Sequence, residues 1–263
     1  MENSIYKLLT SRKFRIMLFS ISFLSLFTYI FPFTLPPPVN VGSRWTYLYS
    51  ETLMSEGKTV YTFEARWKYA VTRSEGEILY LEVNETSKFR YRLENGSWRE
   101  RELNESWYSL VNIRTRASGP MFFCSWWVPS NLRYGDLVPI WNIKFRVTGI
   151  VWMIVEGRIM ECWILKNFDY IPNQEYTFYY ERTSGFFVRY RIRSVYGSFV
   201  KEAERTLLDS SIKWPLLSLL RPFILVLFAV SSTCLIVPPL YKFATNVRNL
   251  VKKGFERRES LLY

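Results

Sequence analysis

Few residues in this chain could carry chemistry, and the residue types that are missing narrow the choice. The sequence has 263 residues, with no histidine and three cysteines. Histidine-ligated metals, Ser-His or Cys-His nucleophile pairs and histidine pH switches are therefore excluded. Three cysteines also cannot complete a zinc site built from four cysteines, or from two cysteines and two histidines. We expect neither a metal nor a cofactor.

The carboxylates and serines form no pattern that is typical of catalysis. Glu156 and Glu161 flank a turn and a strand, but a glycosidase pair needs a cleft between its two carboxyl groups. Ser87 and Lys88 are adjacent, which is not the Ser-x-x-Lys spacing of a serine–lysine nucleophile. No phosphate loop and no Gly-x-Gly-x-x-Gly motif occurs. We predict that the protein is not an enzyme, with a membrane-bound hydrolase as the third and last alternative.

An aromatic cluster at Met121–Pro129 is the most apolar stretch outside two long hydrophobic segments. Its rings are candidates for contact with a hydrophobic ligand or with the outer leaflet, because indole and phenyl groups tolerate a half-wet site. The alternative is a core strand or a plug that closes a sheet. The candidate residues are Phe122, Phe123, Trp126 and Trp127.

Two further features suit a domain outside the cytoplasm. Cys124 and Cys162 are candidates for a disulfide, and the alternative is a pair of buried free thiols. Asn84, Asn95 and Asn104 each begin an Asn-x-Ser/Thr triplet and are candidates for N-glycosylation. For these triplets the alternative is an unmodified polar loop.

Basic side chains alternate with apolar ones along three predicted strands. They could form a patch for anionic headgroups or glycans, since a guanidinium group forks onto phosphate or carboxylate. The alternative is a solvated sheet face with acidic cross-strand partners. Nucleic acid is not an expected partner, because residues 16–213 carry 24 basic and 20 acidic groups. The basic residues are Arg90, Arg92, Lys144, Arg146, Arg189, Arg191 and Arg193.

Two long apolar segments flank the predicted domain that carries these candidate residues. The first covers residues 16–35, and the second covers Pro222–Leu240 within residues 214–241. As helices they would span about 28–30 Å each, the thickness of a bilayer core. We predict two transmembrane helices. A signal peptide is the alternative for the first, although no alanine precedes Ala65 to form a cleavage site; a buried core helix is the alternative for the second.

Charge predicts how the chain is threaded. The N-terminal segment 1–15 and the C-terminal segment 242–263 are both basic. Both termini are therefore expected in the cytoplasm, with residues 36–213 outside the plasma membrane. Arg221 and Trp214 are expected at the outer interface.

The C-terminal segment has a pattern typical of a basic amphipathic helix. Such a helix beside a membrane span lies on the anionic inner leaflet. The alternative is a frayed basic flank. The residues predicted to contact the leaflet are Lys242, Arg248, Lys252 and Lys253.

Residues 36–213 are predicted to form antiparallel strands. Polar and apolar residues alternate over Lys88–Leu93, Trp141–Val147 and Phe186–Arg193, as in strands with one face in water. Glycine-containing turn signals separate such runs, and we expect about eight to ten strands. These turns are Glu75-Gly76, Asn95-Gly96, Glu156-Gly157, Thr183-Ser184-Gly185 and Tyr196-Gly197.

The run Ile150–Val155 departs from this alternation. Both of its faces are apolar, as in a strand that is covered on both sides. A curled sheet, a packed loop, a partner or a lipid must therefore cover the second face.

The order of motifs in this domain carries a resemblance. Gly42-x-x-Trp45-x-Tyr47 is followed by a valine, glycine and Cys-Trp strand at Val155–Leu165, a Tyr-Tyr-acid hairpin at Tyr179–Tyr190, and Thr206–Ser211. This order resembles a broad group of uncharacterised archaeal and bacterial membrane-anchored surface proteins, over most of residues 42–211. The group is similar in strand pattern to periplasmic lipoprotein carriers (LolA/LolB-like). The resemblance implies a mainly β fold, with a curved antiparallel sheet wrapped like a half-barrel.

The resemblance has one departure. Where relatives have Pro-Ala-Gly, this chain has Val155-Glu156-Gly157. We therefore expect the turn at this position to differ from theirs.

Together these features predict a two-pass membrane protein that displays a β domain outside the cell. It would act as an accessory or scaffold subunit of a membrane complex for transport or secretion, and the small polar residues Ser231–Thr233 suit helix–helix contact. The alternative is a surface module that binds a lipid or another hydrophobic ligand. Membrane lipids and another membrane protein are the expected partners.

Overall fold

The computed structural model describes residues 11–30, 39–93, 95–119, 122–169 and 172–259. The chain divides into two compact units. One unit combines Met1–Phe31 with Arg221–Tyr263, and the other is Pro32–Leu220. The first is helical and the second carries all the strands described below.

Ten strands of the second unit form one antiparallel sheet in the order β4-β3-β2-β1-β10-β9-β8-β7-β6-β5. The sheet is not closed, and β4 and β5 are its edges. The prediction of a mainly β, antiparallel domain is confirmed. The strands are β1 (Arg44–Ser55), β2 (Lys58–Glu75), β3 (Ile78–Arg92), β4 (Trp98–Asn112), β5 (Leu137–Ile140), β6 (Ile143–Val155), β7 (Arg158–Asn167), β8 (Gln174–Glu181), β9 (Phe187–Tyr196) and β10 (Phe199–Ser210).

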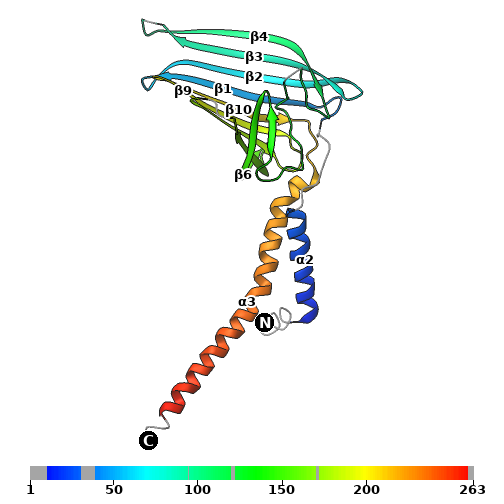
Figure 1. The fold of residues 1–263 in the computed structure, drawn as a ribbon, viewed down its shortest axis with the longest axis vertical. Helices are drawn as coiled ribbons and strands as arrows, with labels where there is room; N and C mark the ends of the chain where they lie inside the picture. The colour runs from blue at the N-terminus through cyan, green and yellow to red at the C-terminus, as the bar shows by residue number, and fades with distance from the viewer. Residues whose placement is uncertain (1–10, 31–38, 94, 120–121, 170–171, 260–263) are drawn as a thin grey trace. The chain divides into compact units, whose positions relative to one another are not determined.

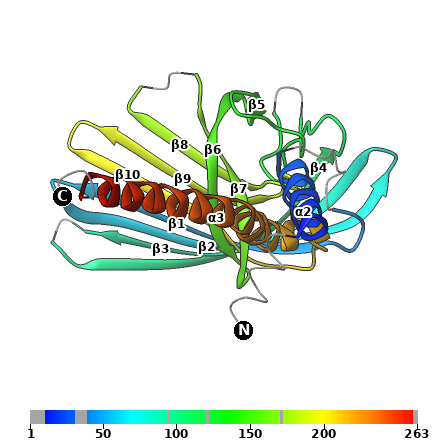
Figure 2. The same ribbon diagram turned by 90° about the horizontal axis from the view of Figure 1, so that it is seen from below.

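The sheet bends along its length. In Figure 1, β1–β4 form one layer and β6, β9 and β10 lie beneath it. In Figure 2, β6 runs across the direction of β1–β3. Strands twist relative to their neighbours, so ten of them accumulate a large rotation. The bend gives the sheet an inner face, which is apolar, and an outer face, which is polar.

The alternation in sequence explains the two faces. On β3, Leu81 and Val83 are fully buried on the inner face. On its outer face, Lys88 and Arg90 both pair with Glu100 of β4, at 2.6 and 3.5 Å.

All five predicted turns connect neighbouring strands, and each places its glycine at positive φ. The strand predicted at Trp141–Val147 starts later than expected. Trp141 has a φ of 55°, and its backbone pairs with Phe123, so β6 begins only at Ile143.

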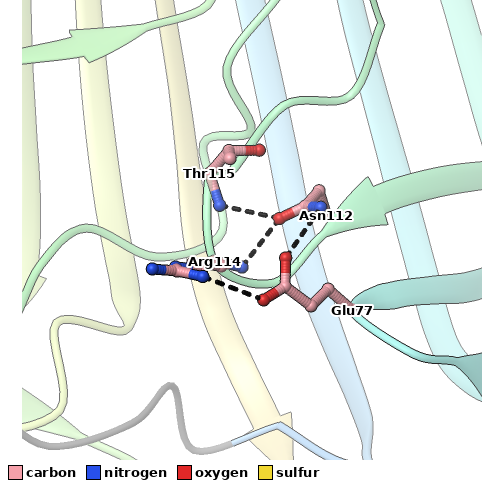
Figure 3. A network of polar contacts seen from close by, with 4 residues as sticks. All are labelled: Glu77, Asn112, Arg114 and Thr115. Atoms are coloured by element: carbon pink, nitrogen blue, oxygen red, sulfur yellow. Dashed lines mark hydrogen bonds and ion pairs between the residues drawn. The ribbon is translucent and has the colours of Figure 1, made fainter.

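A long connection of residues 113–136, the plug, joins β4 to β5. Its start is fixed by polar contacts (Figure 3): the Asn112 side chain accepts hydrogen bonds from the backbone N–H groups of Arg114 and Thr115, at 2.9 and 2.7 Å. Glu77 accepts a hydrogen bond from Asn112 and pairs with Arg114. These contacts turn the chain at the end of β4. They also hold the start of the plug beside the turn between β2 and β3, which contains Glu77.

The other unit contains α2 (Arg12–Ile30) and, from Arg221 onward, α3 (Leu216–Glu259). Ser22 and Ser231 share a buried hydrogen bond, with 2.6 Å between their Oγ atoms. Ser231 thus contacts the other helix of the same chain, whereas contact with a second membrane protein stays a prediction.

Among the described residues, only Leu216–Ile236 is long and apolar enough to cross a membrane. The apolar run of α2, Ile16–Phe27, is shorter, and residues 31–35 of the predicted first span lie outside the described residues. The structure thus offers one candidate span where two were predicted.

The predicted second helix, residues 214–241, begins at Leu216 and continues to Glu259 without a break. Residues 1–10 of the predicted N-terminal segment lie outside the described residues. So do the side chains of the four tail residues predicted to contact the leaflet, Lys242, Arg248, Lys252 and Lys253.

Candidate functional site

The aromatic cluster predicted as a ligand mouth divides between the core and the surface. Trp127 is only 1% exposed and its backbone pairs with Phe186 of the turn between β8 and β9. The Trp126 ring packs edge-on against Tyr69, with 5.5 Å between centroids. These two rings therefore pack on the inner face, as the alternative of a plug expects. Phe122 is 52% exposed, and Phe123 is half-buried.

A tight turn at Glu181–Phe186 holds the plug. The Glu181 carboxylate is fully buried and accepts hydrogen bonds from the N–H groups of Thr183 and Ser184 and from the Ser184 hydroxyl, at 2.6–2.8 Å. Val128 then donates its N–H to the Gly185 carbonyl at 2.8 Å. A carboxylate without these donors would be costly to bury, so the glutamate and the turn stabilise each other.

Arg116 fastens the plug from inside. Its guanidinium donates to the backbone carbonyls of Trp127, Cys124 and Pro139 at 2.7–3.0 Å. The side chain is buried, and its charge is solvated by carbonyl oxygens rather than by an acid.

Beyond the plug, the inner face carries a row of five rings, four of which are only half-buried. We call Tyr49, Tyr61, Phe63, Trp67 and Phe89 the aromatic wall. Phe63 contacts Phe89 and Tyr49, with centroids 4.5 and 5.4 Å apart, and Tyr49 stacks on Trp67 at 5.1 Å. All but Tyr49 are accessible to solvent in part, so this is an apolar surface that nothing in the described chain covers completely.

A buried cation lies under this wall. Arg205 of β10 is the cross-strand partner of Tyr49 and is 6% exposed. Its guanidinium lies over the rings of Tyr47 and Trp67, at 4.3 and 4.7 Å, and donates to the Tyr69 hydroxyl at 2.7 Å. Within the described part of the chain, no carboxylate pairs with it and its Nε has no hydrogen-bond partner.

The phenols around this cation are neutral. Burial raises the pKa of Tyr47 well above its ordinary value, although the charge of Arg205 opposes the shift. Burial likewise raises the pKa of Tyr190, the other cross-strand neighbour of Arg205, to about 12. Neither phenol can ionise near pH 7 to neutralise Arg205, so the guanidinium is compensated only by ring faces and one hydroxyl.

The arginines of the outer face are arranged differently. Arg189 and Arg191 both pair with Glu204, at 2.5 and 2.9 Å, and Arg193 pairs with Glu202 at 3.6 Å. Burial alone would raise the pKa of Glu204, but the two guanidinium groups hold it below its ordinary value. A groove of about 540 Å³ follows this face, and its two arginines, Arg191 and Arg193, are paired as the solvated-face alternative expects.

The two cysteines of the β domain, Cys124 and Cys162, are both free thiols in the structure. Burial raises the pKa of Cys162 well above its ordinary value, and the nearby Glu181 and Glu161 raise it further. Burial also raises the pKa of Cys124, against the opposing charge of Arg116. Both are therefore unreactive thiols rather than nucleophiles.

This arrangement predicts the outcome of thiol counting. In the folded protein a maleimide should leave Cys124 and Cys162 unmodified, because both are buried and protonated. After denaturation without reductant, all three cysteines of the chain should react, as intact mass measurement would show. Reaction of Cys234 alone would establish a disulfide instead.

The candidate glycosylation sites differ in their surroundings. Asn95 is exposed at the turn between β3 and β4, where its side chain accepts a hydrogen bond from the Ser97 N–H at 3.0 Å. Asn84 and Asn104 lie on neighbouring strands, and Asn84 accepts a hydrogen bond from Ser106 at 2.6 Å. The side chain of Asn84 is thus already used within the sheet, whereas Asn104 is exposed on the edge strand β4.

The aromatic wall and Arg205 were missed at the level of sequence, although a signal exists. Ala203, Arg205 and Leu207 alternate on β10, which places an arginine in the apolar register. No group of three or more side chains that could ligate a metal occurs among the described residues.

Comparison with known proteins defines the class of fold only loosely. No protein-family model matches the sequence, and no curated protein matches it. A Bacteroides fragilis protein described as exported and YmcC-like in fold is 10% identical, with a TM-score of 0.26 over 68% of this chain and 99% of that one.

Two further solved structures are similar at 10% identity. A DUF1329 family protein from Desulfovibrio piger has a TM-score of 0.22, over 76% of this chain and 94% of that one. A hypothetical protein from Chlamydia trachomatis has a TM-score of 0.25, over 67% and 93%. TM-scores below 0.5 carry no argument about the fold. The evidence for an open antiparallel sheet is therefore the strand order of this chain itself.

Proposed function

We propose that this protein is a non-enzymatic, membrane-anchored binding module for an elongated hydrophobic ligand with an anionic end. The observation that carries the proposal is Arg205, a buried cation without a carboxylate partner beneath a half-exposed wall of rings. Burying an unpaired charge is costly. A ligand carboxylate or phosphate would lower that cost with charge-assisted hydrogen bonds.

The wall supplies the apolar part of the site. Its rings offer contiguous faces to an acyl chain or a ring system, and burying apolar surface contributes about 25 cal/mol per Å². Trp67, a member of the wall, contacts both Tyr49 and the guanidinium of Arg205. The apolar surface and the positive charge are therefore within reach of one amphiphile. The accessory-subunit role has no comparable support among the described contacts.

The ligand class is tested with a pyrene-labelled long-chain fatty acid and the matching alcohol, titrated against the full-length protein in nanodiscs. Phe63→Ser and Phe89→Ser should each weaken binding of both probes about tenfold, the effect of losing roughly 1.4 kcal/mol of ring contact. Arg205→Met should weaken binding of the fatty acid by a similar factor and leave binding of the alcohol unchanged.

The matched control is Arg90→Ser, because Arg90 is the neighbour of Phe89 on the opposite face and its exposed ion pair with Glu100 contributes little. Arg205→Met should fold at least as stably as the wild type, since replacing a buried charge by an apolar side chain is often neutral or stabilising. An unchanged acid-to-alcohol ratio in that folded variant would refute the role of Arg205.

We also propose that α3 crosses the membrane, that α2 accompanies it through the Ser22–Ser231 contact, and that both termini are cytoplasmic. The support is the span Leu216–Ile236, the buried hydrogen bond between the helices, and the basic flanks. Protease added outside intact cells should digest the β domain and leave epitope tags at both termini protected. Cleavage of either tag from outside would contradict this threading.

A further inference from the structure

The hairpin between β6 and β7 carries an apolar surface that the domain leaves uncovered. Ile154 and Ile159 are cross-strand partners next to the turn, and they are 78% and 57% exposed. Ile154 belongs to the run Ile150–Val155 of β6, and Ile159 lies on its partner strand β7. The sequence predicts that the second face of this run is covered. The aromatic wall is elsewhere, on the inner face of β1–β3.

This second face is most exposed at the hairpin tip. Trp163 is buried beneath the guanidinium of Arg182, 4.8 Å from its ring. Trp152, the next residue of this face toward the tip on β6, is half-buried. The final pair, Ile154 and Ile159, is more exposed than Ile150 of the same face, which is 40% exposed. Large apolar residues grouped at a protruding tip mark a contact site.

The tip is fixed beside the start of the candidate membrane span. Glu156, at the turn of the hairpin, has a φ of 50°, and its carboxylate accepts a hydrogen bond from the Trp214 indole at 2.7 Å. Trp214 is buried, against the expectation that it faces the membrane interface, and its ring packs edge-on against Phe186 at 5.9 Å. Leu216, where α3 and the span begin, follows two residues later and is exposed.

The glutamate at position 156 thus supplies the acceptor that ties the hairpin to the exit of the chain.

We infer that the β6–β7 hairpin inserts its tip into the interfacial layer of the bilayer in which α3 is anchored. The interfacial region is about 5–8 Å thick on each side of the hydrocarbon core, and the tip is tied through Glu156 to Trp214, two residues before the span begins. Ile154 and Ile159 would enter the apolar boundary, and the exposed, basic Arg158 between them would reach headgroup phosphates. The hairpin then acts as a second point of membrane contact and fixes the tilt of the domain.

The test places an environment-sensitive fluorophore on single cysteines in full-length protein reconstituted into liposomes, in a Cys234→Ser background. Ile154→Cys and Ile159→Cys report the tip. Phe199→Cys, an exposed apolar position at the β9–β10 hairpin, is the matched control from another hairpin. Lipids with a shallow nitroxide should quench both tip labels at least about twofold and leave the control label unquenched, as expected for residues in the interface.

The inference rests on the proposed anchoring, so alkaline carbonate extraction is run on the same samples. Resistance to extraction together with quenching of both tip labels supports the inference. Resistance with tip labels no more quenched than the control overturns it and leaves the anchoring intact. Release of the protein by carbonate overturns the anchoring, and the hairpin contact with it.

Discussion

Gly185→Ala should destabilise the β domain by about 2–5 kcal/mol, combining about 1–2 kcal/mol for a left-handed alanine with about 1–3 kcal/mol for overlap. Gly185 has a φ of +69°, and a β-carbon built there would lie 2.1 Å from the Val128 carbonyl oxygen. That oxygen belongs to the backbone of the plug, so no side-chain rotation can relieve the overlap. Denaturant unfolding of the detergent-solubilised protein, followed by tryptophan fluorescence, measures the loss.

Gly197→Ala is the matched control. Gly197 has a φ of +60° at the turn between β9 and β10, and nothing lies within 4 Å of an added β-carbon. Gly197→Ala should lower the free energy of unfolding only by the cost of a left-handed backbone conformation for alanine, about 1–2 kcal/mol. Equal destabilisation by the two substitutions would show that the plug is not packed against the turn at Gly185.

Much of the sheet could be predicted because its signals are local. A glycine that must adopt positive φ is visible in a dipeptide, and all five turns predicted in this way connect neighbouring strands. Alternation likewise separates the polar face from the apolar one without knowledge of any partner strand. The turn at Glu56-Gly57 between β1 and β2 has the same signal and was overlooked.

The plug could not be predicted because its contacts are not local. Cys124, Trp126 and Trp127 form a run whose composition suits a surface mouth and a buried plug equally well. Burial was decided by pairing with Gly185–Phe187, far along the chain. The position of Trp214 also depends on a contact far along the chain, because its indole donates a hydrogen bond to Glu156. Its closeness to the predicted span alone suggested a ring at the membrane interface.

Three buried arginines show why charge in a sequence does not identify a site. Arg116 is solvated by three carbonyls, and Arg182 pairs with Glu161 at 2.6 Å. Of these three, Arg205 alone combines burial with an unpartnered Nε and a half-exposed apolar surface beside it. The partner of each guanidinium, which depends on the tertiary fold, separates the two structural cations from the candidate ligand contact.

Trp127→Ala should cost about 3–5 kcal/mol of unfolding free energy, as expected for emptying a large, fully buried aromatic site. The ring is 1% exposed and packs beside Trp126, with 6.4 Å between their centroids. Phe122→Ala, on the same plug but 52% exposed, should change stability by less than about 0.5 kcal/mol. Both variants are compared by denaturant unfolding and by fatty-acid binding. If the tryptophan variant kept full stability and lost binding, Trp127 would be a ligand contact and the plug would be the mouth of the site.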